Sequence, residues 1–191
     1  MSLGTRAGVL GLVFLSGCAA EPPQPAEYLD QQTGVTIRTT AAPFVYAHEM
    51  PEAAANLRDY LSVGAVEINN MGSRRYYLVA VSWSTVDRLG GGHAPVPEAL
   101  SLSLGGHDVE LKSASHDARS LGIGDPPFRP PSGLVGEAWY LVTPADLKAF
   151  AAAPSPSIAL RDAAQSISYQ AWRSASSEFA AFVRDIPEAR R

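Results

Sequence analysis

Two hairpin patterns limit the fold of this chain more than any other feature of its sequence. In residues 100–104 leucines alternate with serines, and Gly105-Gly106 then leads into a short apolar run at 109–111. Strict alternation with a period of two is typical of a half-buried strand, and paired glycines favour a tight turn. Residues 60–69 and 74–84 flank Asn-Met-Gly-Ser in a similar way. The sequence therefore predicts an antiparallel sheet.

Further strands are predicted on both sides of these hairpins. Residues 76–83 are apolar on both faces and strongly β-prone, so we expect them to form a central strand. Shorter strand patterns cover residues 35–40, 44–47, 138–142, 157–162 and 167–172. No regular alternation of strands with helices is evident, which disfavours a parallel, doubly wound sheet.

Two short helices are expected late in the chain. The first covers residues 144–153, with Thr143 as its cap and Pro144 at the first helical position. The second covers residues 177–186 and has Ser177 as its cap. Its apolar face consists of Phe179, Phe182, Val183 and Ile186. The predicted fold class is mainly β or α+β: an antiparallel β-sandwich or open barrel with a helical cap.

Residues 113–133 are rich in Ser, Gly and Pro and predict a long, structureless loop. Loops of this length are uncommon in a compact domain and often carry function. The Pro-rich part, residues 125–131, is a candidate for binding a partner in polyproline form. A plain surface connection is the alternative.

The N-terminus has the pattern of an export signal. One positive charge lies within residues 1–6, and residues 7–15 form an apolar stretch too short to span a bilayer. Leu15-Ser16-Gly17-Cys18 follows and resembles the lipobox of bacterial lipoproteins at all four positions. An ordinary secretory signal with an incidental cysteine is the alternative.

The resemblance implies a lipid-anchored domain. Cleavage before Cys18 would leave a diacylglycerol on its thiol and a fatty acid such as palmitate on its amino group. Residues 1–17 are then the signal peptide, residues 18–27 the lipidated cysteine and a Pro-rich tether, and residues 28–191 one β-rich domain. Because Ala19 rather than aspartate follows the cysteine, the family's sorting rule implies the outer membrane, facing the periplasm.

Composition and motifs exclude several classes of partner and cofactor. The formal net charge is −4, so the basic footprint of a nucleic-acid-binding protein is missing. A single cysteine excludes a disulfide framework and a multi-cysteine zinc site. Phosphate-binding and dinucleotide-binding motifs are absent as well. We therefore expect no cofactor and no nucleic acid, and contact with the membrane through the lipid.

Two His-Asp pairs are the candidates for a metal-binding or catalytic site. His107-Asp108 and His116-Asp117 could hold a metal ion or provide a base oriented by a carboxylate. Neighbouring residues on a strand point to opposite faces, however, so neither pair converges if it is extended. Ordinary polar loop residues are the simpler interpretation. No nucleophile-elbow or His-Glu-x-x-His motif accompanies the pairs.

Aromatic residues on the predicted strands are candidates for binding. Tyr76-Tyr77 and Trp139-Tyr140 are adjacent rings, which must point to opposite faces of a strand, so one ring of each pair could be exposed. Exposed rings could stack on sugars of peptidoglycan or contact an envelope protein. The candidates are Tyr76, Tyr77, Trp83 and Trp139. Filling the core is the alternative role for these rings.

These patterns favour a non-enzymatic envelope lipoprotein that binds a protein or cell-wall partner. The first alternative is a lipid-anchored hydrolase or metal-binding enzyme that uses the region of His107 and His116. The second is an accessory subunit of a secretion or assembly complex. The His-Asp pairs would favour the enzyme, and the aromatic residues and residues 125–131 would favour a binding function.

Overall fold

The computed structural model describes residues 23–49, 58–84, 98–104, 106–129, 135–154, 156–161 and 166–187. The strands of this part of the chain are β1 (Ala26–Leu29), β2 (Thr36–Thr39), β3 (Phe44–Glu49), β4 (Arg58–Asn70), β5 (Ser73–Ser84), β6 (Ala99–Leu104), β7 (His107–Ser115), β8 (Val135–Val142), β9 (Ser157–Arg161) and β10 (Ser166–Arg173). A 3-10 helix, η1 (Arg119–Leu121), and two α-helices, α1 (Pro144–Ala152) and α2 (Ser176–Arg184), complete the described elements.

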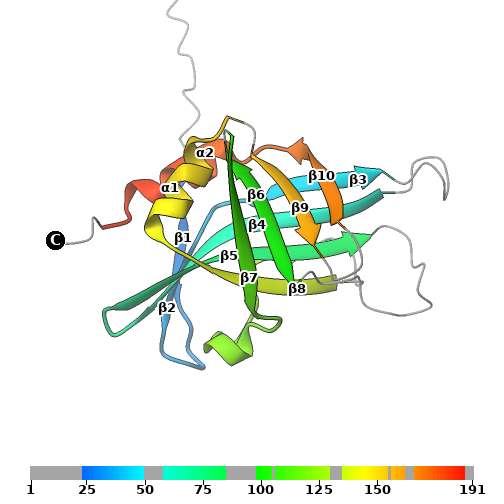
Figure 1. Ribbon diagram of the computed structural model, residues 1–191. Coiled ribbons are helices and arrows are strands. Elements are labelled where there is room, and N and C mark those ends of the chain that lie inside the picture. Colours follow the sequence, from blue (N-terminus) through cyan, green and yellow to red (C-terminus); the bar gives the residue numbers. More distant parts are fainter. Residues whose placement is uncertain are drawn as a thin grey trace, which may run out of the picture.

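Eight of these strands close into an antiparallel barrel (Figure 1). The order around the barrel is β4-β3-β10-β9-β6-β7-β8-β5, and β5 pairs back onto β4. The prediction of a mainly antiparallel β fold is confirmed, with the barrel closed rather than open. Both predicted hairpins are present, as β4–β5 and β6–β7.

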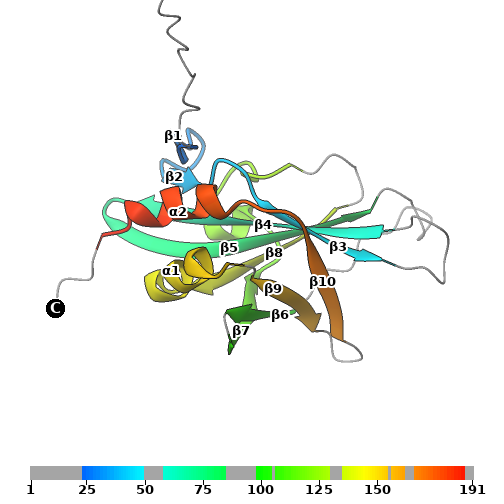
Figure 2. The ribbon, with the colours of Figure 1, turned by 90° about the horizontal axis from the view of Figure 1, so that it is seen from above.

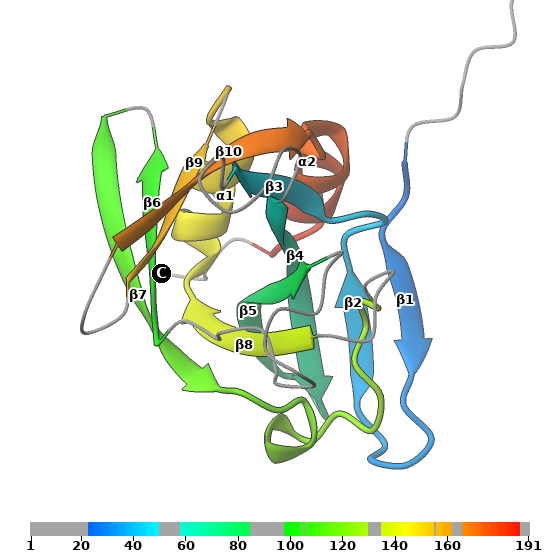
Figure 3. The same ribbon diagram turned by 90° about the vertical axis from the view of Figure 1, so that its right-hand side faces the viewer.

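Strand β4 has two partners in succession along one of its edges. The first half of β4 pairs with β3, from Arg58 to Val63, and the last part pairs with β2, from Val66 to Asn69. The opposite edge of β4 pairs with β5 along nearly its whole length. Because β1 pairs only with β2, these two strands extend the sheet away from the barrel (Figure 3).

The two α-helices lie at the same end of the barrel (Figures 1 and 2). Phe150 of α1 and Phe179 of α2 are fully buried, and their ring centroids are 4.9 Å apart. Both rings contact Phe44 of β3, at 5.5 and 5.1 Å. The helices therefore extend the core that fills the barrel. None of the helices in the described residues is long and apolar enough to cross a membrane.

The predicted capping residue is correct for α1 and wrong for α2. Thr143 caps α1 as expected: its hydroxyl accepts the backbone N–H of Asp146 at 3.2 Å, and the Asp146 carboxylate accepts that of Thr143 at 3.0 Å. Helix α2 is also present, but Ser177 is not its cap. The helix begins one residue earlier, after Ala175, and the Ser177 hydroxyl donates to Glu178 at 2.8 Å.

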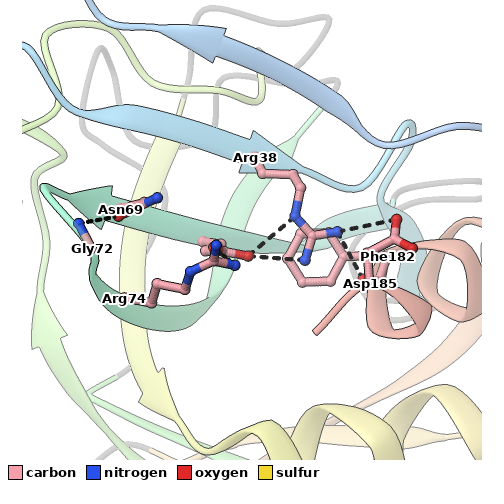
Figure 4. A network of polar contacts seen from close by, with 7 residues as sticks. Arg38, Asn69, Gly72, Arg74, Phe182 and Asp185 are labelled. Atoms are coloured by element: carbon pink, nitrogen blue, oxygen red, sulfur yellow. Dashed lines mark hydrogen bonds and ion pairs between the residues drawn. The ribbon is translucent and has the colours of Figure 1, made fainter. Parts of the chain in front are cut away.

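A buried ion pair joins the sheet to α2 (Figure 4). The Arg38 guanidinium donates to one carboxylate oxygen of Glu67 at 2.9 Å, and Arg74 lies 3.0 Å from the other oxygen. Arg38 also donates to the carbonyl oxygen of Phe182 at 2.9 Å and lies over the Phe182 ring. Its positive charge therefore meets the negative end of the helix dipole.

A second core lies outside the barrel. Tyr77 of β5 and Trp139 of β8 are buried there in one cluster with Ala118 and Ile123, which belong to the segment 116–128. This segment and β2 thus cover outer-facing residues of β4, β5 and β8. Strand β5 is apolar on both faces because each face meets a different core.

The expectation of a structureless loop over residues 113–133 is wrong for residues 113–115 and 119–121, whereas residues 116–118 and 122–129 form no helix or strand and residues 130–133 lie outside the described residues. Strand β7 continues to Ser115, and η1 follows. Asp30, which follows β1, accepts the backbone N–H of Gly124 at 2.5 Å and fastens the segment to the β1–β2 hairpin. Ser, Gly and Asp form turns through local hydrogen bonds, which a search for periodicity does not detect.

Candidate binding groove

The structure keeps the two His-Asp pairs apart. His107 and Asp108 begin β7, whereas His116 and Asp117 follow its end, about 30 Å away along the strand. All four side chains are exposed. Among the described residues, no three His, Cys, Asp or Glu side chains form a group that could hold a metal ion. A site shared by both pairs is therefore ruled out.

Asp117 has a structural role instead. Its carboxylate accepts the backbone N–H groups of Arg119 and Ser120, at 3.2 and 3.1 Å. These bonds satisfy donors at the start of η1, as a capping residue does for a helix.

Three of the four aromatic candidates are buried. Tyr76, Tyr77 and Trp139 are exposed by 8%, 2% and 0%. The interpretation that one ring of each pair is exposed is wrong for them because both faces of β5 and β8 are covered here. Trp83 lies farther along β5 and is only half-buried. It is the one candidate of the four that a partner could contact.

Trp83 lines a groove of about 580 Å³ on the outer face of the barrel. Its lining comes from β3, β4, β5 and β10, and from residues 127–129 of the segment outside the barrel. The side chains are Pro43, Val45, Tyr60, Ser62, Val81, Trp83, Pro127, Phe128, Arg129, Trp172 and Arg173. This volume is in the range of ligand-binding clefts, about 300–1,000 Å³.

Aromatic rings form one wall of the groove. Tyr60 of β4 and Trp83 of β5 are register partners, and their rings stack with centroids 4.2 Å apart. Trp172 of β10 meets Tyr60 edge-on at 6.2 Å and remains 57% exposed. The indole N–H of Trp83 donates to the Ser62 hydroxyl at 3.0 Å, which fixes the ring in place.

The charges at the groove are cationic. Arg129 and Arg173 line it, and the Arg58 guanidinium lies over the Trp172 ring at 4.8 Å. Arg58 is paired with Glu49 at 3.0 Å, and Arg129 has a loose, exposed contact with Asp125 at 3.9 Å. Within the described residues Arg173 forms no ion pair. No carboxylate is among the described residues that line the groove.

Phe128 holds the outer segment against the sheet at the groove. A Cβ added to Gly64 of β4 would overlap the Phe128 ring, so only glycine permits this close approach. The Pro-rich candidate, residues 125–131, therefore contributes a wall through Pro127, Phe128 and Arg129. Residues 130 and 131 lie outside the described residues.

The substitution Gly64→Ala is expected to destabilise the fold by about 1–3 kcal/mol because the new methyl group must displace the Phe128 ring. Urea unfolding of the purified chain measures this cost. In a Phe128→Ala background the overlap is gone, so the same substitution should cost far less. An equal cost in both backgrounds would contradict this packing.

Glu137 is a partly buried carboxylate beside the outer segment, close to Asp117 and Ala118. It lies on β8 opposite Val81, and it accepts the indole N–H of Trp139. Burial raises the pKa of its carboxyl, and the nearby charge of Asp117 raises it further. A raised pKa in the folded state means that ionisation of Glu137 destabilises the fold, increasingly so as the pH rises through the unfolded-state pKa.

The substitution Glu137→Gln should therefore raise the urea midpoint at about pH 7.5, and the gain should vanish near pH 4, where the unfolded carboxyl is itself largely protonated. Glutamine retains an oxygen that accepts the Trp139 N–H. Glu27→Gln, at an exposed residue of β1, is the matched control and should change little at either pH. A gain that persists unchanged at low pH would show that charge is not its cause.

Sequence reasoning missed Tyr60, although a signal was available. A hairpin in which Asn70 pairs with Ser73 also places Tyr60 opposite Trp83, as found. Trp172 is one of the aromatic residues on predicted strands, but no local signal places it or Arg173 beside Trp83, because their strand lies far along the chain and reaches the groove through its pairing with β3.

Searches of family models, curated proteins and solved structures found no match to this chain.

Proposed function

We propose that this chain is a lipid-anchored, non-enzymatic binding module of the bacterial envelope, and that the groove receives its partner. The observation that carries this proposal is the exposed Trp172 beside the Tyr60–Trp83 stack, with Arg129 and Arg173 in the same groove. Trp, Tyr and Arg are the residues that contribute most binding free energy at protein interfaces. An accessory subunit of a secretion or assembly complex would be one form of the same role.

The anchor is supported by the sequence. Leu15-Ser16-Gly17-Cys18 matches the lipobox, and Cys18 itself lies outside the described residues. Strand β1 begins at Ala26, inside the range 18–27 expected to form the tether, so residues 19–25 separate this cysteine from β1; they include Pro22, Pro23 and Pro25. In polyproline form they would span about 22 Å. A domain on so short a tether would act close to the membrane, on the periplasmic side of the outer membrane.

The substitution Cys18→Ser tests the anchor. The native chain should have the mass of a cleaved, acylated product and partition into detergent, whereas the variant should do neither. A native product with a free thiol and no acyl mass would refute the anchor.

A photo-crosslinking amino acid at position 172, in cells that make the full chain, tests the groove. We expect a discrete adduct with an envelope component. The control position is Met71, which is fully exposed at the tip of the β4–β5 hairpin. Adducts at Met71 but none at position 172 would contradict the groove as the binding site.

A further inference from the structure

We infer that the groove binds an acidic, extended peptide segment of a protein partner. This inference rests on the proposed function and adds the chemistry of the ligand. Three independent properties of the groove lead to it: the sign of its charge, the hydrogen-bonding groups that it offers, and the kind of apolar surface beside them.

The charge of the groove is opposite to that of the chain. The full chain has a formal net charge of −4, yet among the described residues the charged side chains that line the groove are Arg129 and Arg173. The Arg58 guanidinium also lies at the Trp172 ring, but its charge is paired with Glu49 at 3.0 Å, so the positive field of the groove depends on Arg129 and Arg173. Glu137, on the strand beside Val81, is directed to Trp139 and is not part of the lining. Such a field attracts a carboxylate and repels a basic segment.

The charged groups of the described lining are donors only, while the hydroxyls of Tyr60 and Ser62 can donate and accept. Arginine and the tryptophan indole donate and do not accept. The hydroxyl of Ser62 already accepts the Trp83 N–H. Neutral sugars present many hydroxyl groups that need acceptors, and no Asp, Glu, Asn or Gln is among the groove's lining residues in the part of the chain that the structure describes. Carboxylates and peptide carbonyls, which only accept, fit these donors better.

The aromatic wall suits an extended peptide. Tyr60, Trp83 and Trp172 lie beside Pro127 and Phe128, so apolar surface is continuous with the guanidinium groups. Aromatic-lined grooves bind proline-rich segments in the extended polyproline form, which is largely preformed and therefore costs little entropy to order. A segment with a proline or aromatic residue next to Asp or Glu would contact both parts at once.

The test uses the purified full chain in detergent and two probes. A phage-displayed library of random 12-residue peptides is selected on the chain, and the affinities of enriched peptides are measured by fluorescence anisotropy. Chitohexaose is the neutral glycan probe. The variants are Arg173→Glu, Arg173→Gln and Trp172→Ala, whose parent residues are exposed. Arg75→Glu is the matched control, since Arg75 is exposed near the other end of β5, about 26 Å from Trp83.

We expect the selected peptides to be acidic. Their affinity should fall about tenfold or more with Trp172→Ala and with Arg173→Glu, and should fall less with Arg173→Gln. It should also weaken as the salt concentration is raised. Arg75→Glu should change it less than about twofold. The proposal of an acidic ligand would be overturned if the enriched peptides were neutral or basic but still required Trp172, or if only chitohexaose bound. In both cases the groove would remain the proposed binding site. If neither probe binds in a way that depends on Trp172, both proposals are overturned.

Discussion

Replacing Glu67 with alanine is expected to destabilise the folded chain by about 3–5 kcal/mol, the range found when one partner of a buried ion pair is removed. Glu67 is 3% exposed and Arg38 is 8% exposed. Without the carboxylate, the Arg38 guanidinium would keep the carbonyl of Phe182 and a contact of 3.8 Å with Asp185, itself well exposed. A buried cation would then lack its compensating charge.

The expected cost depends on burial rather than on the ion pair as such. Glu49 and Arg58 form a pair with the same 3.0 Å separation as Glu67 and Arg74, but the Glu49 side chain is 68% exposed. Glu49→Ala should therefore cost no more than about 1 kcal/mol. Urea unfolding of both variants provides the comparison. Equal costs would show that the Arg38 site is not desolvated as the structure indicates.

A double variant separates the charge from the packing. If Arg38→Met is combined with Glu67→Leu, no buried charge is left unpaired and most of the apolar volume is retained. Stability should recover most of what Glu67→Ala loses, because apolar replacements of buried pairs are often neutral. If the double variant is as unstable as Glu67→Ala, the ion pair itself holds β2, β4 and α2 together.

Local patterns predicted the hairpins and the first helix because their signals lie within a few residues. The alternation at Leu100, Leu102 and Leu104 gives the inner face of β6, and all three side chains are buried. Thr143 and Asp146 form a capping box that can be predicted from four residues. Closure of the barrel depends instead on pairings such as β3 with β10, which no local pattern encodes.

The candidate site was harder to predict because exposure depends on what covers each face. Trp139 and Trp83 both lie on predicted strands, yet one is in the outer core and the other lines the groove. The difference is the position of the segment 116–128, which sequence reasoning treated as a loop. Arg38 and Glu67 were missed for the same reason, since charged residues on a strand are normally solvated.

Replacing Phe179 with alanine is expected to cost about 3–5 kcal/mol, as is usual for a fully buried phenylalanine. Phe179 is 0% exposed and its ring contacts both Phe44 of the barrel and Phe150 of α1. A cavity at this position would weaken the packing of both helices on the barrel at once. We expect a lower melting temperature and increased binding of a hydrophobic dye.

The conservative variant Phe179→Leu shows whether the aromatic cluster or only the apolar volume is required. Leucine retains most of the buried volume and should cost less than about 1.5 kcal/mol. Near-ultraviolet circular dichroism reports the packing of the aromatic side chains independently of stability. If Phe179→Ala leaves both the melting temperature and this spectrum unchanged, α2 does not cover the end of the barrel, and the helical end is a separate unit from the core within the strands.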